Sequence, residues 1–297
     1  MSARPTAAAR CLHGDPRPAF APARAADALQ RIGRAATAAL HDELALHPKP
    51  GLVSFVDNGS HADMTGATFV RSLFALRRYF PAIAALGAAD ADFGELERAG
   101  VAAEARMLRA TGGVNTHRGA IFTLGLLCAS AGWRAARGLA TDAAGLREAL
   151  RGRWGAALAA RPPAHADSHG QRAVRRHGLR GASAEAALGL PALFEVAWPA
   201  WRAARARGLD DELVRLEVLF HVLAVLDDTN LVHRGGLPGL RHAQRSARAF
   251  LAAGGAQRPD ARAHALAIHA DFVRRRLSPG GSADVLAAAC WLARVAP

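Results

Sequence analysis

Alanine and leucine fill every long stretch of this chain, and this composition restricts the fold more than any other feature of the sequence. Aromatic residues make up only 6% of it, with Tyr79 the single tyrosine. Sheets favour β-branched and aromatic side chains, whereas alanine and leucine are strong helix formers. We find no convincing strand-like alternation and no Asn-Gly turn between hydrophobic runs. With 51% hydrophobic residues among 297, the chain can bury a sizeable core, and we predict an all-α, multi-helix, single globular domain.

Apolar residues recur at intervals of three and four positions, which is typical of helices that bury one face. Residues 1–24 instead contain four prolines among small residues, and we expect them to form a flexible leader before a helical domain at 25–297. Residues 161–181, with two prolines and three histidines, are the best candidate for a long functional loop, whose role stays open. The predicted helices cover residues 25–46, 67–79, 93–110, 115–131, 142–160, 183–206, 210–226, 239–253, 259–276 and 282–295.

The chain carries a net charge of +13, and Lys49 is the single lysine among its 38 cationic side chains. Scattered arginines are compatible with the codon bias of a GC-rich genome and equally with a surface for a polyanion, because charge alone defines neither fold nor chemistry. The three cysteines, Cys11, Cys128 and Cys290, follow no metal-binding spacing, which favours a reducing compartment. No apolar run has the length of a signal peptide or a membrane span, so we expect a cytoplasmic protein with no membrane partner.

Polar, glycine-rich segments interrupt the helices and concentrate Asp, Asn and His where an ordinary turn would not need them. The first runs from 49 to 64, where Asp57, His61 and Asp63 place two carboxylates and an imidazole within seven residues. Such a group suits a divalent cation or paired acid and base roles. An Asx turn followed by a helix cap would explain the same residues without a ligand.

The second segment links Glu104 to the glycine turn at 112–113. Glu104 and Thr111 lie two helical turns apart on one face, so the carboxylate should face that turn. The turn precedes a helix whose free N–H groups, together with Arg118, suit phosphate oxygens. A C-cap followed by an N-cap at Asn115 would account for the same residues.

Three further segments lead from polar residues into helices. Residues 177–191 include Glu185 near glycine turns, and a surface connection explains them more simply. Residues 226–236 end an apolar helix with two acids, an amide, an imidazole and an arginine, and acids there oppose the helix dipole, so we favour a functional role. Residues 278–284 begin the last helix, where Ser282 and Asp284 suit capping, which leaves the preceding Ser-Pro-Gly-Gly unexplained.

Taken in order, these segments resemble the triphosphoribosyl-dephospho-CoA synthase family, all-helical enzymes that make the prosthetic-group precursor of malonate decarboxylase and citrate lyase. The Lys-Pro form at 49–50 favours the malonate decarboxylase branch. The segments that carry the resemblance are Lys-Pro-Gly-Leu-Val-Ser at 49–54, Asn-Gly-Ser-His-Ala-Asp-Met at 58–64, Ala-Thr-Gly-Gly-Val-Asn-Thr-His at 110–117, Asp-Thr-Asn at 228–230 and Ser-Pro-Gly-Gly-Ser-Ala-Asp at 278–284.

The resemblance implies a pentosyl transfer in which ATP loses adenine and its ribose C1 becomes bonded to the 2′-hydroxyl of 3′-dephospho-CoA. Residues 25–297 would then be the catalytic domain, with the glycine-rich loops forming one active-site cleft. The product would pass to a holo-carrier-protein synthase step, a homodimer is compatible with the sequence, and nucleic acid is not an expected partner. Such a transfer needs a base for the hydroxyl, support for an oxocarbenium-like centre, a proton for adenine and a grip on the triphosphate.

On this basis we expect the following roles. Glu104 would be the base or the oxocarbenium stabiliser, and His61 and His117 would protonate adenine or orient the base. Asp57, Asp63 and Asp228 would hold Mg²⁺ on the triphosphate, since Mg²⁺ prefers carboxylate oxygens and is often shared with substrate phosphates. The residues expected to bind ATP or dephospho-CoA are Lys49, Ser60, Asn115, Thr116, Arg118, Asn230, Arg234, Ser278, Gly280, Gly281 and Asp284.

Two other functions stay open. A helical, Mg²⁺-dependent ADP-ribosyl-type hydrolase would use similar acidic clusters, with water as the acceptor. A basic, non-enzymatic module that binds nucleic acid or an acyl-carrier protein would explain the arginines but not the acids. Adenine release that depends on dephospho-CoA separates the three.

Overall fold

The computed structural model describes residues 22–161 and 178–296, and within these ranges it contains helices and no strand, which confirms the all-α prediction. Residues 1–21 of the predicted leader and most of the loop predicted at 161–181 lie outside the described residues. The helices are α1 (Pro22–Ala45), α2 (Gly66–Leu76), α3 (Tyr79–Ala88), α4 (Phe93–Thr111), α5 (Arg118–Ala135), α6 (Ala143–Ala160), α8 (Ala182–Ala187), the π-helix η1 (Ala192–Ala197), α9 (Trp198–Ala206), α10 (Asp211–Leu223), α11 (Thr229–Ala252), the 3₁₀-helix η2 (Gly255–Gln257), α12 (Ala261–Arg274) and α13 (Gly280–Val295).

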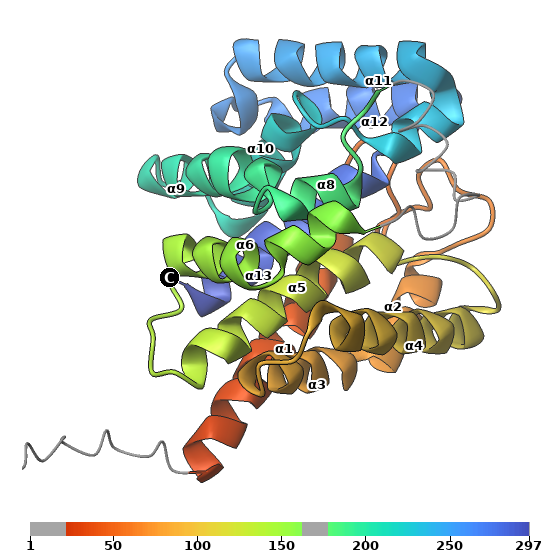
Figure 1. Cartoon of the computed structure of the whole chain (residues 1–297). Helices are drawn as coiled ribbons and strands as arrows, with labels where there is room; N and C mark the ends of the chain where they lie inside the picture. Colours follow the sequence, from red (N-terminus) through yellow and green to blue (C-terminus); the bar gives the residue numbers. More distant parts are fainter. Residues whose placement is uncertain (1–21, 162–177, 297) are drawn as a thin grey trace, which may run out of the picture.

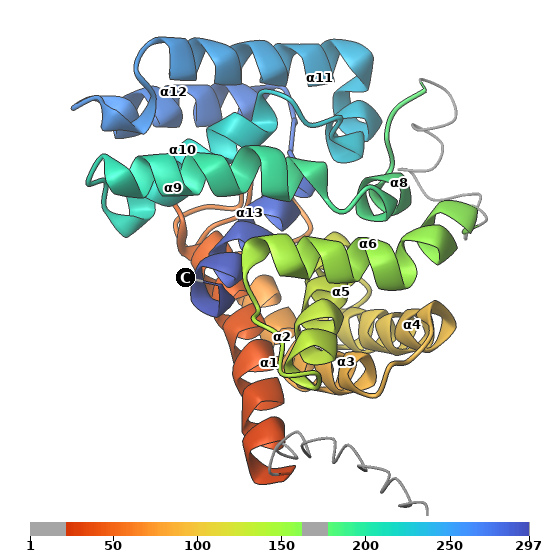
Figure 2. The ribbon, with the colours of Figure 1, turned by 60° about the vertical axis from the view of Figure 1, so that its left-hand side comes forward.

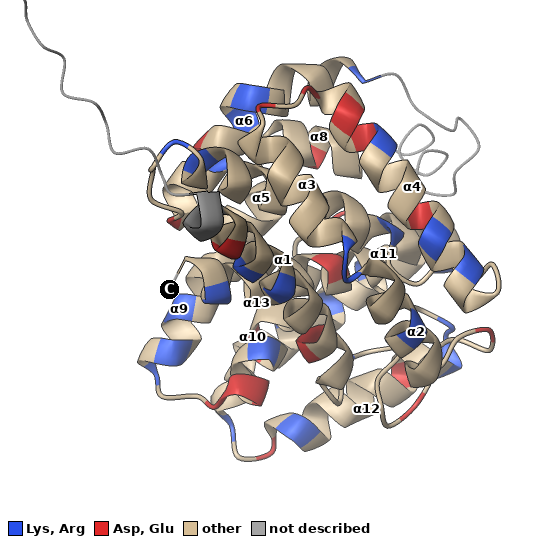
Figure 3. Cartoon of the chain, turned by 90° about the horizontal axis from the view of Figure 1, so that it is seen from below, with Lys and Arg blue, Asp and Glu red and all other residues tan. Residues whose placement is uncertain are grey.

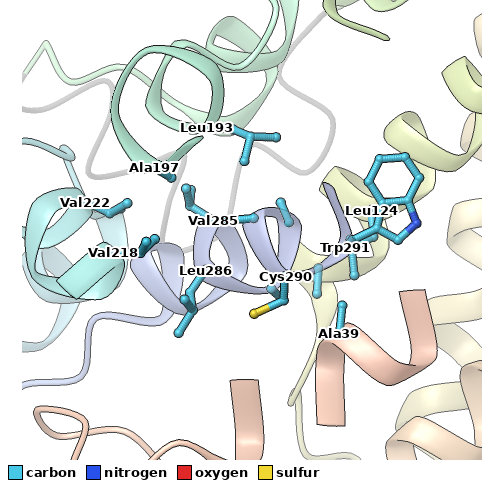
Figure 4. Packing of buried hydrophobic residues seen from close by; sticks show 14 of the residues in the cluster. Ala39, Leu124, Leu193, Ala197, Val218, Val222, Val285, Leu286, Cys290 and Trp291 are labelled. Carbon is cyan, nitrogen blue, oxygen red and sulfur yellow. The ribbon is translucent and has the colours of Figure 1, made fainter. Parts of the chain in front are cut away.

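Helix α13 runs through the middle of the molecule, with α1, α3 and α5 on one side and α9 to α12 on the other (Figures 1 and 2). It packs against α1, α5, α10 and η1. Cys290 and Trp291 are fully buried, and the Trp291 indole donates a hydrogen bond to the Ile32 carbonyl at 3.1 Å. Figure 4 shows the apolar side chains that surround this helix. Because the rest of α13 is core, its first turn is held in a fixed position.

Side chains at the helix starts explain many of the boundaries. Asp92, Asp142 and Asp210 are N-caps whose carboxylates accept N–H bonds from the first turns of α4, α6 and α10. Thr65 and Thr68 form a capping box at α2. These starts fall within one or two residues of the predicted ones.

Three stretches differ from the predicted helices, each because of proline or glycine. Helix α3 was not predicted, since its third residue is Pro81, which the first turn of a helix tolerates. The helix predicted at 183–206 is broken at Gly189 and Leu190, both with positive φ. Helix α11 begins earlier than predicted and is kinked at Gly236, two residues before Pro238.

Charged side chains of both signs are interspersed over the helices, as α1 and α4 show in Figure 3. Several arginines pair with acids, for instance Arg215 and Arg294, which both contact the Asp42 carboxylate. The excess of arginine is therefore partly neutralised locally. In the described part of the chain, no helix has both the length and the apolar character needed to cross a membrane.

Candidate active site

Four of the five polar segments meet where helices α5, α11 and α13 begin. The first segment contacts the fifth through Ser60, whose hydroxyl donates to the Leu277 carbonyl at 2.6 Å, and through the His61 ring, 2.8 Å from the Ser278 hydroxyl. Arg234 of the fourth segment donates to the Ser60 carbonyl at 3.1 Å. Residues far apart in the chain thus form one polar region.

Asp228 joins the fourth segment to the fifth. Its Oδ1 accepts N–H bonds from Asn230 and Leu231 as the N-cap of α11, while its Oδ2 accepts from the Ser282 amide at 2.8 Å and the Ser282 hydroxyl at 3.1 Å. Burial raises the pKa of this carboxyl, opposed by those hydrogen bonds. Its oxygens are therefore occupied by the protein itself, and Gly280 and Gly281 pack directly over Asn230 and Asp228.

Asp284 joins the fifth segment to the second, at the start of α5. A Cβ added to Gly119 would lie 1.9 Å from its Oδ2, so only glycine allows the carboxyl to approach this turn. Burial raises the pKa of Asp284 well above its usual value, and the negative charges of Asp228 and Glu43 raise it further, whereas the Ala120 amide lowers it. Asp284 therefore holds its proton more tightly than an ordinary carboxyl.

The His61 ring lies between Arg234 and Ser278 at the edge of this region. Arg234 Nη2 is 2.9 Å from His61 Nδ1, and because a guanidinium only donates, Nδ1 accepts and Nε2 donates to Ser278. Burial and the Arg234 charge lower the pKa of His61 to about 4, against the opposing effect of Asp63 at 3.6 Å. His61 is therefore neutral near pH 7.

Lys49 lies beneath the loops and has no exposed surface. Its ammonium donates to the Glu43 carboxylate at 2.5 Å and to the Glu43 carbonyl at 2.6 Å. Burial lowers the pKa of Lys49, and Glu43 opposes this shift. The structure thus places Lys49 within the support of the site, shielded from solvent.

Asp57 turns toward two histidines of this supporting layer. Its Oδ1 accepts from the Gly59 amide at 2.7 Å, as expected for an Asx turn, and lies 3.3 Å from His269 Nε2. Its Oδ2 lies 3.8 Å from His47 Nδ1. The other nitrogen of His269 donates to the Lys49 carbonyl at 2.8 Å. Asp57 therefore ties the first segment to α12.

His117 is buried at the start of α5. Its Nδ1 is 2.6 Å from the Ser72 hydroxyl of α2, and the Phe69 ring packs edge-on against the imidazole. Burial, assisted by the Lys49 charge, lowers the pKa of His117 to about 3, so the ring is neutral. Among the described residues, neither His117 Nε2 nor the adjacent Thr116 Oγ1 has a hydrogen-bond partner, although both atoms are buried.

Glu104 and Arg118 form an ion pair beside this turn, with Arg118 Nε 2.6 Å from the Glu104 carboxylate. Both side chains are partly exposed. The Asn115 side chain accepts the Arg118 amide at 3.1 Å, and Gly112 ends α4 in the left-handed conformation. The predicted C-cap at Gly112 is therefore confirmed, whereas the N-cap of α5 is His117 and not Asn115, and α5 begins three residues later than predicted. The Glu104–Arg118 pair stays available at the surface.

Among the described residues, no hydrogen bond or ion pair that we find joins the third segment to the other four. Glu185 accepts from the Ala192 amide at 2.6 Å and pairs with Arg180, so it fixes the start of η1.

Two surface cavities of about 780 and 420 Å³ lie beside α6 and beside η2, and no predicted site residue lines either one.

The described part of the chain has no group of three or more His, Cys, Asp or Glu side chains that could hold a metal ion. Asp228 is occupied by four donors, and Asp57 faces the Gly59 amide and two histidines. Asp63 is 64% exposed and keeps accessible oxygens. The donors thus fit an Mg²⁺ ion held by one or two carboxylates together with substrate phosphates, and they do not fit a closed protein site.

Three buried polar residues of the region were missed from the sequence. Glu43 falls on the apolar face of α1, three and four positions after Leu40 and Ala39. A carboxylate on that face could have indicated a buried charge with a partner. His269 lies likewise on the buried face of α12. Ser72 gave no signal, because a buried serine in a helix ordinarily bonds to its own backbone.

The fold and the site define an all-helical protein whose polar centre, at the starts of three helices, combines carboxylates with arginines suited to a phosphorylated substrate. The ATP:dephospho-CoA triphosphoribosyl transferase family model matches residues 29–296. A protein of Pectobacterium atrosepticum named 2-(5''-triphosphoribosyl)-3'-dephosphocoenzyme-A synthase is 39% identical over 281 residues, 89% of this chain and 87% of the relative. One of Stutzerimonas stutzeri, named "Probable 2-(5''-triphosphoribosyl)-3'-dephosphocoenzyme-A synthase", is 39% identical over 285 residues, 92% and 94% of the two chains.

The chain therefore belongs to the ATP:dephospho-CoA triphosphoribosyl transferase family, as the resemblance predicted. No solved structure matches it.

Proposed function

We propose that this protein transfers the triphosphoribosyl group of ATP to the 2′-hydroxyl of 3′-dephospho-CoA with release of adenine. The observation that carries the proposal is the convergence of four family-like segments on the starts of α5, α11 and α13, within a chain that the family model spans almost completely. In this transfer the C1–N9 bond of ATP breaks, the C1–O2′ bond forms, and the hydroxyl proton balances the one that adenine takes up.

The partly exposed arginines are our proposed ligands for phosphate. Arg118 pairs with Glu104 in the free protein, so a phosphate that binds Arg118 would release the Glu104 carboxylate for the attacking hydroxyl. Arg234 and Asn230 lie at the surface of the fourth segment, where a second phosphate group could be bound. Glu104 thus stays the proposed base.

The proton for adenine is better assigned to Asp284 than to a histidine. His61 and His117 both have lowered pKa values, of about 4 and about 3, and carry no imidazolium proton near pH 7. Asp284 has a raised pKa and part of the residue still reaches the surface. We propose that the two rings donate or accept hydrogen bonds as neutral groups and that Asp284 supplies the proton.

Mg²⁺ is our proposed cofactor, held by Asp63 and assisted by Asp57, with the triphosphate completing its coordination. When bound, it would neutralise charge on the triphosphate. Asp228 we assign instead to positioning, because its oxygens already bind α11 and α13. The Lys-Pro form at 49–50 supports malonate decarboxylase as the recipient pathway, which loading of apo-carrier proteins of malonate decarboxylase and of citrate lyase would compare.

The decisive experiment incubates purified protein with ATP, Mg²⁺ and 3′-dephospho-CoA, and follows adenine release and the mass of the nucleotide product. We expect release to depend on dephospho-CoA and Glu104→Gln and Asp63→Asn to slow it. Glu97→Gln is the matched control, because Glu97 also pairs with an arginine and lies on the same helix. Wild-type rates in both site variants would show that the site is misplaced.

The other two functions give different results in the same assay. Adenine release or ribosyl hydrolysis with water alone would indicate the hydrolase. Salt-sensitive binding to DNA without nucleotide turnover would indicate a binding module.

A further inference from the structure

Ser72 is a buried helix residue whose hydroxyl does not make the usual bond to its own backbone. Ser130 and Ser246 donate to the carbonyl four residues earlier, at 2.8 and 3.1 Å. The Ser72 hydroxyl instead lies 2.6 Å from His117 Nδ1. A serine hydroxyl has one hydrogen, and among the described residues the imidazole nitrogen is the acceptor placed to take it.

This geometry determines where the imidazole carries its own hydrogen. If Nδ1 accepts from Ser72, a neutral ring carries its hydrogen at Nε2. The ring is held besides by the Phe69 edge contact, and the His117 amide lies 3.2 Å from the Met107 sulfur. Its orientation is thus fixed from three sides, by α2, by α4 and by the start of α5.

The nitrogen at the other end of the ring is a buried donor with no acceptor among the described residues. The hydroxyl of Thr116, one residue earlier, is in the same situation. Buried polar atoms without partners cost free energy, and two of them in consecutive residues at one helix start indicate a polar ligand there. Arg118 follows directly, so that ligand is an anion or carries one.

We infer that Ser72 is a positioning residue that holds His117 in its Nε2–H tautomer, so that this N–H donates a hydrogen bond to a phosphate oxygen or a purine nitrogen of a bound nucleotide. The inference rests on the proposed function only in taking a nucleotide as the ligand. ATP and 3′-dephospho-CoA share these acceptors, and the two are compared separately.

The test uses the whole protein labelled with ¹⁵N-histidine, in which long-range nitrogen–proton spectra report the tautomer of each ring. We expect His117 to show one Nε2–H tautomer, and Ser72→Ala to convert it to a mixture. Ser130→Ala removes an equally buried hydroxyl from α5 and should leave the His117 signals unchanged. An Nδ1–H tautomer in the wild type, or an unchanged tautomer in Ser72→Ala, would overturn the inference.

Ligand is then added as a non-reactive ATP analogue, as inorganic triphosphate and as 3′-dephospho-CoA, each alone. A shift of the Nε2–H signal with triphosphate identifies a phosphate acceptor, and a shift with ATP analogue but not triphosphate identifies the purine. A shift with dephospho-CoA alone assigns the acceptor to that substrate. No shift with any of the three contradicts the inference, because the donor would then serve a bound water.

Kinetics give an independent readout. Ser72→Ala removes one positioned hydrogen bond, and we expect it to lower kcat/KM for adenine release by a factor on the order of ten. In a His117→Ala background, Ser72→Ala should add less than about a twofold further loss, whereas a purely structural role would multiply the two effects. If no transfer activity exists but the tautomer and the nucleotide shift are observed, the proposed function fails and this inference stands.

Discussion

Lys49 and Glu43 are two charged residues that pair with each other in the interior of the protein. Their ion pair is almost completely buried, at 2.5 Å, under loops that carry the site. A buried pair adds little net stability compared with apolar side chains, because both charges lose their water. Removing one partner is different, since the remaining charge is left without compensation in the interior.

We therefore expect Lys49→Met to lower the free energy of unfolding by about 3–5 kcal/mol. Urea unfolding followed by circular dichroism measures this. The double variant Lys49→Met with Glu43→Leu should recover most of the loss. Arg31→Met, which breaks an exposed pair with Asp27 on the same helix α1, should cost less than ~1 kcal/mol. Equal losses for the two pairs would show that the buried charge is not the cause.

Asp284 gives a second prediction, on the pH dependence of stability. Its folded pKa is raised, so above the unfolded pKa the folded protein binds more protons than the unfolded chain. The free energy of unfolding then falls as pH rises, by up to about 1.4 kcal/mol per pH unit, until the folded pKa is passed. Asp284→Asn removes this contribution, so in a series from pH 4 to pH 8 the stability of the variant relative to wild type should rise with pH until the folded pKa is passed.

Urea titrations across that range, with Asp27→Asn as an exposed control on α1, provide the comparison. A constant difference between Asp284→Asn and wild type at all pH values would contradict a raised pKa.

At the scale of elements, the site consists of helix starts that are tied to one another. Asp228 binds the first turn of its own helix α11 and the first turn of α13, while Asp284 of α13 reaches the first turn of α5. The starts of α13 and α5 are therefore each held by a side chain from another helix start, Asp228 and Asp284 respectively. Asp228 is thus both a helix cap and a contact between two helices. Its removal should lower the free energy of unfolding more than the removal of an ordinary cap does.

For Asp228→Ala we expect a loss of about 2–4 kcal/mol, the sum of a cap and of a buried Ser282 amide left unpaired. Asp210→Ala removes an exposed cap from α10 and should cost about 1 kcal/mol. Thermal and urea unfolding of the two variants side by side measure the difference. Losses of the same size would mean that the link to α13 contributes nothing.

The sequence predicted helices well where local chemistry determines them. Asp92, Asp142 and Asp210 mark helix starts that a reader of the sequence can find, because an N-cap acts within its own first turn. The sequence did not predict α3, which has Pro81 in its first turn, or the break at Leu190, which has a positive φ although it is not glycine.

For the site, motifs identified the segments but not the contacts between them. The Ser72–His117 and Asp228–Ser282 bonds join residues 45 and 54 positions apart, and no local sequence pattern predicts them. That Asp63 and Asp57 hold a metal stays a prediction, as does the catalytic role of Glu104, whereas Asp228 is assigned to positioning because α11 and α13 occupy its oxygens.

At the scale of the whole molecule, the net charge of +13 is spread over helices that also carry acids (Figure 3). Long-range attraction of a polyanion needs a continuous surface of one sign. The exposed Arg274 and Arg275, beside the fifth segment, both pair with Asp271. Arg118 pairs with Glu104, so acids interrupt the cationic surface near the site.

We expect binding to double-stranded DNA with a Kd no tighter than ~10⁻⁶ M at physiological salt, weakening steeply as salt is raised. Binding of ATP should change less over the same range, since fewer counterions are released. Fluorescence anisotropy at about 50 and 200 mM salt compares the two ligands. Tight DNA binding that survives the higher salt would favour the non-enzymatic module.

Some backbone amides at the helix starts around the site are already hydrogen-bonded to side chains, namely those of Asp228, Asp284 and Asn115. The side-chain oxygens of these residues take the positions at the amides that phosphate oxygens would otherwise occupy. Bare amides at helix N-termini bind small anions such as inorganic phosphate. At these helix starts few amides are free for such an ion, and we expect tighter binding from a ligand that also contacts Arg118 or Arg234.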